Sequence, residues 1–230
     1  MRRGLAATSE QAGIAVASRT DRGVSARANA LALTSDLEGR ALLRSLNGIA
    51  PDLVFRAASP VPPGFDPRRA RSRWYRYFQS AEGRSREAWG ENARLLTGRL
   101  DVRSFGRGIP ADRPTWRDVD RLEVSQRGRW LLVDVRARSF VWGMVRKIVA
   151  TLRAIEDGEV AAEAVARAVR GELRLTLPLA EPEPLVLWEV AYPIRWAYRS
   201  EAAARHHVAY RAREGERARV RGRTLDAVYR

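Results

Sequence analysis

The 230-residue chain is 45% hydrophobic and 30% charged, which is a globular composition long enough for one large domain or two smaller halves, and its formal net charge is +15. It contains no cysteine, and its two histidines, His206 and His207, are adjacent; disulfides and thiolate metal sites are therefore excluded, and we expect no metal site. No apolar run is long enough for a membrane span and the start lacks a signal peptide, so we expect a cytoplasmic protein without membrane contact that binds a polyanion.

The first predicted elements are two short strands that flank an arginine-rich loop. Apolar runs at residues 14–17 and 30–33 predict the strands, and residues 18–27 between them read S-R-T-D-R-G-V-S-A-R. Asp21 is a lone carboxylate in this loop, and loops on a rigid scaffold often carry chemistry. A surface ion pair of Asp21 with a neighbouring arginine is the structural alternative.

A helix is predicted next, followed by a break in the chain. The S-D-L-E sequence at 35–38 fits a capping box, so the helix would begin there, run to Leu46 and stop at Asn47-Gly48. Prolines and a glycine between residues 60 and 67 then mark a hinge. We therefore expect an N-terminal half over residues 1–60, a C-terminal half over 61–198 and an arginine-rich tail over 199–230.

Alternating residues predict strands in the second half. Over residues 71–78 the alternation assigns Trp74 and Phe78 to a core and leaves Tyr75 on the opposite face. Residues 122–138 read as a hairpin that turns at 127–129. Strands and helices are interleaved without a βαβ rhythm, so we expect an α+β fold with a largely antiparallel mixed sheet and flanking helices.

Two helices and a last strand complete the pattern. Apolar residues recur at helical spacing from Phe140 to Ile155, which leaves Arg146 nearly opposite the apolar stripe before Asp157-Gly158 ends the helix. A second helix is predicted over residues 159–170, with Gly171 as its stop. The apolar run at 185–188 predicts a core strand.

Five segments along the chain, in the same order, resemble motifs of the TruA family of tRNA pseudouridine synthases. They are residues 18–27, similar to the G/S-R-T-D-x-G-V loop; 47–52, similar to N-x-x-L-P-x-D; 65–68 with 73–77, similar to F-x-x-R and R-x-Y-x-Y; 95–105, similar to L-L-x-G…S-F; and 139–149, similar to S-F-x-x-x-M-V-R-x-I-V. The resemblance extends over roughly residues 1 to 195.

The resemblance implies the pseudouridine synthase fold, with two similar halves around a central basic cleft, usually as a homodimer. It implies conversion of uridine to pseudouridine in tRNA, in the anticodon stem-loop, without a cofactor. Asp21 matches the essential aspartate, Arg146 the arginine that pairs with it, and Tyr75 the tyrosine that faces the target base. The residues expected to bind RNA phosphates or order the loop are Arg19, Arg22, Arg27 and Arg68.

The implied reaction needs one ionised carboxylate. Asp21 would attack C1′ or C6 of the nucleoside, or assist formation of a glycal, and the sequence leaves these three routes open. Because burial favours a neutral acid, a cation such as Arg146 is required beside it. Two other functions stay open, namely a noncatalytic basic RNA-binding protein and a nuclease, which would need clustered carboxylates for metal.

The chain also departs from the family pattern. The Y-D-G strand and the G-W-Q motif that precede the family's first helix do not occur in it, so we expect the true start to lie upstream. Arg22, Ser25 and Arg138 stand where bacterial relatives commonly carry Ala, His and Asn, and this variant resembles the archaeal branch.

Overall fold

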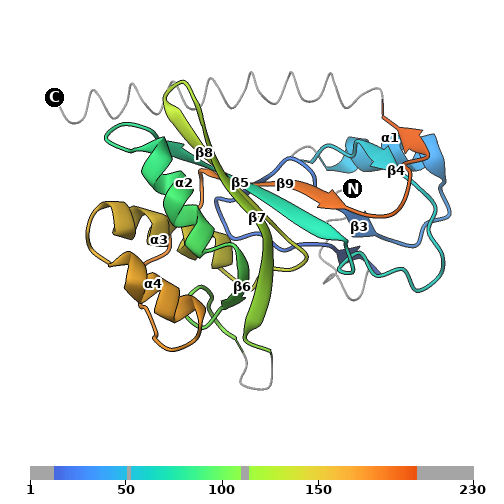
Figure 1. Ribbon diagram of the computed structural model, residues 1–230. Helices are drawn as coiled ribbons and strands as arrows, with labels where there is room; N and C mark the ends of the chain where they lie inside the picture. Colours follow the sequence, from blue (N-terminus) through green and yellow to red (C-terminus); the bar gives the residue numbers. More distant parts are fainter. Residues whose placement is uncertain (1–12, 51–52, 110–113, 201–230) are drawn as a thin grey trace. The chain divides into compact units, whose positions relative to one another are not determined.

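The structure, a computed structural model, describes residues 13–50, 53–109 and 114–200 (Figure 1). The chain divides into two compact units, Met1–Ala32 with Asp66–Pro193 and Leu33–Phe65 with Ile194–Arg230. The sequence-based halves meet at residue 60, whereas the Asp21 loop belongs to the same unit as the elements after residue 66, because strand β2 (Ser25–Ala26) pairs with β9 (Leu185–Ala191). The tail beyond residue 200 lies outside the described residues.

The first unit is built on a mixed sheet that has six strands within the described residues. In addition to β2 and β9 it contains β5 (Ser72–Ser80), β6 (Gly98–Asp101), β7 (Trp116–Arg127) and β8 (Trp130–Ala137). The strand order is β2-β9-β5-β8-β7-β6, in which β2 and β9 are parallel and every other pair is antiparallel. This arrangement confirms the predicted α+β class and the largely antiparallel mixed sheet.

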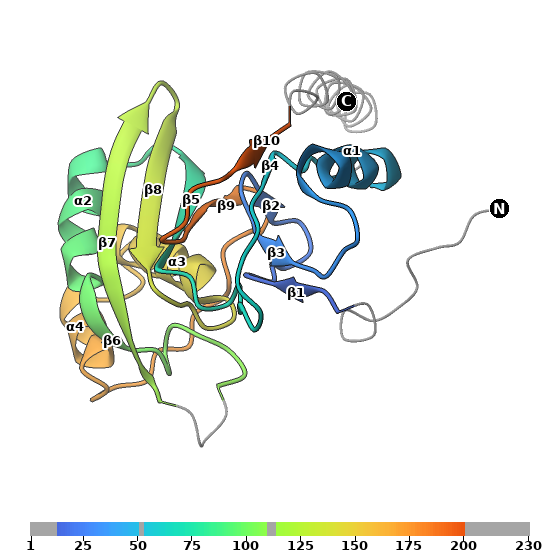
Figure 2. The ribbon, with the colours of Figure 1, turned by 90° about the vertical axis from the view of Figure 1, so that its right-hand side faces the viewer.

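Three helices of this unit lie together on one face of the sheet (Figures 1 and 2). They are α2 (Arg86–Leu95), α3 (Met144–Glu156) and α4 (Ala162–Val169). The largest fully buried side chains between these helices and the sheet include Tyr77, Trp89, Phe105, Leu131, Met144, Ile148, Leu152 and Leu187. No helix among the described residues has both the length and the apolar character needed to cross a membrane.

The predicted facing of strand β5 is wrong. Tyr75 and Tyr77 are buried on the face that the helices cover, whereas Trp74 and Phe78 are only half-buried on the other face, where both pack near Trp188. Alternation gives the two faces of a strand but not which one the helices cover. Here the indole rings stack with arginine guanidinium groups instead of filling the core.

The other expected elements of this unit are confirmed with shifted boundaries, since β7 begins at Trp116 and not at residue 122, and α4 begins at Ala162 and not at residue 159. Strands β1 (Ala15–Val16) and β3 (Leu31–Ala32) pair antiparallel on either side of the arginine-rich loop, and β7 and β8 form the expected hairpin. Helix α3 begins at Met144 and not at Phe140, because Gly143 adopts the left-handed conformation with φ of 75°. The apolar stripe of α3 faces the core, as predicted.

The second unit contains α1 (Gly39–Ile49), β4 (Ala57–Ala58) and β10 (Tyr198–Arg199), and the two strands pair antiparallel. The predicted capping box is wrong, because the helix begins at Gly39 and the Ser35 hydroxyl accepts a hydrogen bond from the Leu37 N–H outside it. Asn47 does not end the helix. It is buried, and its side-chain amide donates to the carbonyl oxygens of Leu43 and Phe55.

Candidate active site

Asp21 lies in the loop between β1 and β2, where two side chains from the region around α3 hold its carboxylate. Arg146 Nη1 donates to Oδ2 of Asp21 at 2.8 Å, and Trp142 Nε1 donates to Oδ1 at 2.7 Å. The Asp21 side chain keeps 25% of its surface exposed and that of Arg146 14%. The carboxylate is therefore fixed by two donors and still reachable from solvent.

The guanidinium of Arg146 is itself fixed in place. The residue lies on α3 away from the apolar stripe, and its Nε donates to the carbonyl oxygen of Ala180 at 2.6 Å. The Ala180 N–H in turn donates to the carbonyl oxygen of Arg146 at 3.3 Å. Because a guanidinium keeps its proton in proteins, this contact gives Asp21 a permanent positive neighbour.

The loop that carries Asp21 makes a tight turn at Gly23. The Val24 N–H donates to the carbonyl oxygen of Asp21 at 3.1 Å, and Gly23 has a φ of 91°. A Cβ at Gly23 would lie 3.0 Å from Oε1 of Glu183 and 3.0 Å from Cγ of Pro182. The turn therefore requires glycine both for its backbone conformation and for its close approach to the 182–183 segment.

Arg73 joins strand β5 to the start of the loop. Its residue surface is only 7% exposed, and its Nε donates to the Ser18 hydroxyl at 2.8 Å. Nη2 donates to the carbonyl oxygens of Ala17 and Arg68 at 2.9 and 2.8 Å, and Nη1 donates to that of Arg138. One buried side chain thus joins strand β5 to three other stretches of the chain, at residues 17–18, 68 and 138.

Tyr75 lies beside the same loop. Only 8% of its surface is exposed, and its ring packs edge-on against Phe140 with 5.0 Å between the ring centroids. Burial raises the pKa of the Tyr75 hydroxyl; a hydrogen bond with Ser18 and the charge of Arg73 act against this rise, and the charge of Asp21 adds to it. The phenol is therefore neutral and close enough to Asp21 to sense its charge.

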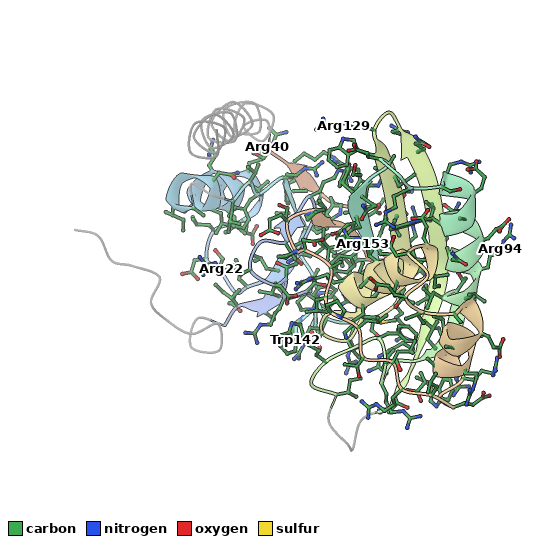
Figure 3. All side chains as sticks on the ribbon, turned by 90° about the vertical axis from the view of Figure 1, so that its left-hand side faces the viewer. Arg22, Arg40, Arg94, Arg129, Trp142 and Arg153 are labelled. Carbon is green, nitrogen blue, oxygen red and sulfur yellow. The ribbon has the colours of Figure 1, made fainter. Side chains whose placement is uncertain are left out.

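The four arginines expected to contact RNA are exposed and do not converge on Asp21 through any hydrogen bond or ion pair within the described residues. They are Arg19, Arg22 (labelled in Figure 3), Arg27 and Arg68. Arg68 pairs with Asp66 at 2.9 Å, which lowers the pKa of Asp66. Arg27 stacks on the ring of Trp188, 4.8 Å from its centroid. Their contact with RNA stays a prediction.

A metal site does not emerge from the part of the chain that the structure describes. Within residues 13–50, 53–109 and 114–200, no group of three or more His, Asp or Glu side chains is placed to hold a metal ion. His206 and His207 lie outside these residues. The expected lack of a metal stays a prediction.

Comparison with known proteins agrees with the expected family. Residues 93–193 match the family model described as tRNA pseudouridine synthase. Three relatives named tRNA pseudouridine synthase A are similar to most of the chain. The relative from Thermococcus kodakarensis is 40% identical over 77% of this chain and 67% of its own length; that from Pyrococcus horikoshii is 38% identical, over 76% and 68%; and that from Methanoculleus marisnigri is 36% identical, over 80% and 67%.

The chain belongs to the TruA family of tRNA pseudouridine synthases. The three relatives come from archaea, as the variant loop sequence suggested, and the match spans about two thirds of their length. Of the residues that the TruA resemblance nominated, the structure brings Asp21 and Arg146 into contact and places Tyr75 beside Ser18, which begins the Asp21 loop.

Two residues near Asp21 received no role from the sequence, although both lie within TruA motifs. Trp142 occupies an x position of the S-F-x-x-x-M-V-R motif, where no residue type is specified. Arg73 begins the R-x-Y-x-Y motif and lies on the same strand face as Tyr75, two residues away. If the buried face of β5 had been assigned correctly, the sequence would have predicted a buried arginine beside Tyr75. Nothing in the sequence indicated the contact of Trp142 with Asp21.

Proposed function

We propose that this protein converts uridine to pseudouridine in tRNA, with Asp21 as the nucleophile. The observation that carries the proposal is the 2.8 Å ion pair between Asp21 and Arg146, two residues that are 125 positions apart in the chain. Membership of the TruA family supports the reaction and the substrate class.

The reaction is an isomerisation, so its atoms balance without a redox partner. The bond between N1 and C1′ breaks, the uracil rotates, and a bond forms between C5 and C1′. C5 loses its proton and N1 gains one. Asp21 acts as a carboxylate in each of the three routes, either attacking C1′ or C6 or assisting glycal formation, and Arg146 pairs with that carboxylate at 2.8 Å.

The proposed substrate is the anticodon stem-loop of tRNA. The net charge of +15 and the exposed Arg19 and Arg22 support a phosphate-rich partner. The target uridine must leave its stack to reach Asp21, which costs a few kcal/mol. Tyr75 is the aromatic residue that would face the extruded base. A cytoplasmic location, a homodimer and independence from metals and cofactors belong to this proposal.

Tritium release from tRNA labelled at C5 of uridine tests the proposal, because the C5 proton leaves only when the new bond forms. The wild-type protein should release tritium, and Asp21→Asn should release none. Asp36→Asn is the matched control, since Asp36 is an exposed carboxylate in the second unit. Sequencing of the product should then locate pseudouridine in the anticodon arm.

Two outcomes of these assays would contradict the proposed function. If wild-type protein binds tRNA in a gel-shift assay but releases no tritium, the protein is an RNA-binding relative without catalysis. If Asp21→Asn releases tritium at the wild-type rate, another residue is the nucleophile.

A further inference from the structure

Trp142 makes a contact with Asp21 that the family motif does not specify. Its indole N–H donates to Oδ1 of Asp21 at 2.7 Å, while Arg146 donates to Oδ2 at 2.8 Å. The two donors therefore act on different oxygens of one carboxylate. An indole carries a single N–H donor, and in Trp142 that donor is used on Asp21.

The position of Trp142 is determined by the backbone around it. The Arg107 N–H donates to its carbonyl oxygen at 2.9 Å, and the Met144 N–H closes a turn on the carbonyl oxygen of Val141 at 3.1 Å. Gly143 follows in the left-handed conformation, where an added Cβ would lie 3.0 Å from Leu179. The turn thus directs the indole toward the Asp21 loop.

Packing does not account for this tryptophan. Trp142 is 58% exposed, whereas its neighbours Phe140 and Val141 pack against the core (Figure 3 labels Trp142). Large aromatic residues in the core of this unit, such as Trp89, are fully buried. An exposed indole contributes little burial free energy, so its placement is better explained by its hydrogen bond.

We propose that Trp142 is a positioning residue that fixes the plane of the Asp21 carboxylate. The terminal torsion of an aspartate is broad, so one contact from Arg146 leaves the carboxylate free to turn. A second donor on the other oxygen removes that freedom. This inference rests on the proposed role of Asp21 as nucleophile.

The expected consequence is an effect on the chemical step. A nucleophile held in the attacking geometry raises the rate of that step, whereas substrate binding depends mainly on contacts elsewhere. Loss of the indole N–H should therefore lower kcat and leave KM for tRNA unchanged.

Two substitutions separate the N–H from the ring. Trp142→Phe keeps an aromatic ring and removes the donor. Trp142→His keeps a donor, because Nε2 of histidine occupies the same place in its five-membered ring as Nε1 of tryptophan, and at pH 8 the neutral ring can carry its proton there. Trp130→Phe, at an exposed tryptophan in the β7–β8 hairpin, is the control for the loss of an indole.

The experiment measures kcat and KM by tritium release at pH 8, with thermal denaturation to verify folding. We expect Trp142→Phe to lose about tenfold in kcat at unchanged KM, and Trp142→His to recover most of that loss. A wild-type kcat in Trp142→Phe, or a loss in Trp142→His as large as that in Trp142→Phe, overturns the inference. A change confined to KM also overturns it, because the ring would then act as a surface for nucleotide stacking.

The same assay distinguishes this failure from failure of the proposed function. Activity that disappears in Asp21→Asn but stays at the wild-type kcat in Trp142→Phe refutes the role of Trp142 alone. Activity that survives in Asp21→Asn refutes the proposed function itself.

Discussion

Nε of the buried Arg73 lies 2.8 Å from the hydroxyl of Ser18, and this contact joins the central strand β5 to the loop that presents Asp21. The other guanidinium nitrogens of Arg73 donate to the carbonyl oxygen of Ala17, next to Ser18, and to those of two further segments at Arg68 and Arg138. The loop that carries Asp21 therefore owes its position to an arginine that does not contact the Asp21 carboxylate in any described hydrogen bond.

Arg73→Lys should destabilise the protein. Lysine has a compact ammonium group that cannot reach four acceptors in the planar arrangement of a guanidinium, so buried oxygens lose their partners. We expect the free energy of unfolding to fall by about 2–3 kcal/mol, measured by urea denaturation, together with a loss of activity. Arg129→Lys, at the exposed β7–β8 turn, is the control. Equal stability of the two variants would refute the structural role of Arg73.

Arg146→Lys should impair catalysis more than folding. The guanidinium donates to the Ala180 carbonyl and to Asp21 from different nitrogens, and one ammonium group cannot reproduce that geometry. We expect kcat for tritium release to fall about 100-fold, a loss typical for removing one catalytic hydrogen-bond donor. Arg94→Lys on the exposed side of α2 (labelled in Figure 3) should retain activity. Full activity of Arg146→Lys would show that charge alone suffices.

Gly23→Ala should reduce both stability and activity. Alanine at a positive φ costs about 1–2 kcal/mol, and its Cβ would also press on Pro182 and Glu183. Gly128→Ala provides the matched control, because Gly128 also has a positive φ but no atom within 4 Å of an added Cβ. We expect Gly128→Ala to lose stability and keep its kcat. The same kcat in both variants would mean that the close approach at Gly23 does not position Asp21.

Tyr75→Phe should alter the alkaline stability of the protein. Burial raises the pKa of the Tyr75 hydroxyl, so the folded chain binds that proton more tightly than the unfolded chain. The resulting stabilisation is complete below a pH of about 10, the value for an unfolded tyrosine, and is lost as the pH rises through the folded-state pKa. In urea titrations above pH 10, Tyr75→Phe should lose stability less steeply than the wild type. Parallel curves would contradict this.

Periodicity predicted much of the fold. The β7–β8 hairpin and the apolar stripe of α3 depend on local patterns of apolar residues, and both are confirmed. The predicted buried face of β5 was wrong, because both faces of the strand carry large aromatic residues, such as Trp74 and Tyr75. The helices that bury the Tyr75 face come from distant parts of the chain. The predicted start of α1 was wrong because the S-D-L-E sequence does not form a capping box. The Ser35 hydroxyl bonds to the Leu37 N–H before the helix, which begins at Gly39.

The site was predicted as far as the motifs specified its residues. Asp21 and Arg146 were nominated by resemblance and lie in contact, which local patterns cannot indicate across 125 positions. Trp142 and Arg73 were missed as participants. Their roles follow from the direction of a turn and the facing of a strand, and both of these are set by tertiary packing.

The most direct test of the central claim is the amount of pseudouridine formed in a single turnover, with enzyme in excess over an unmodified tRNA transcript. The claim is that the carboxylate of Asp21, paired with Arg146, attacks the nucleoside. Wild-type protein should convert its target uridine, and Asp21→Asn should react at least about 1,000-fold more slowly while it still binds the transcript. Pseudouridine formed by Asp21→Asn at the wild-type rate would contradict the account.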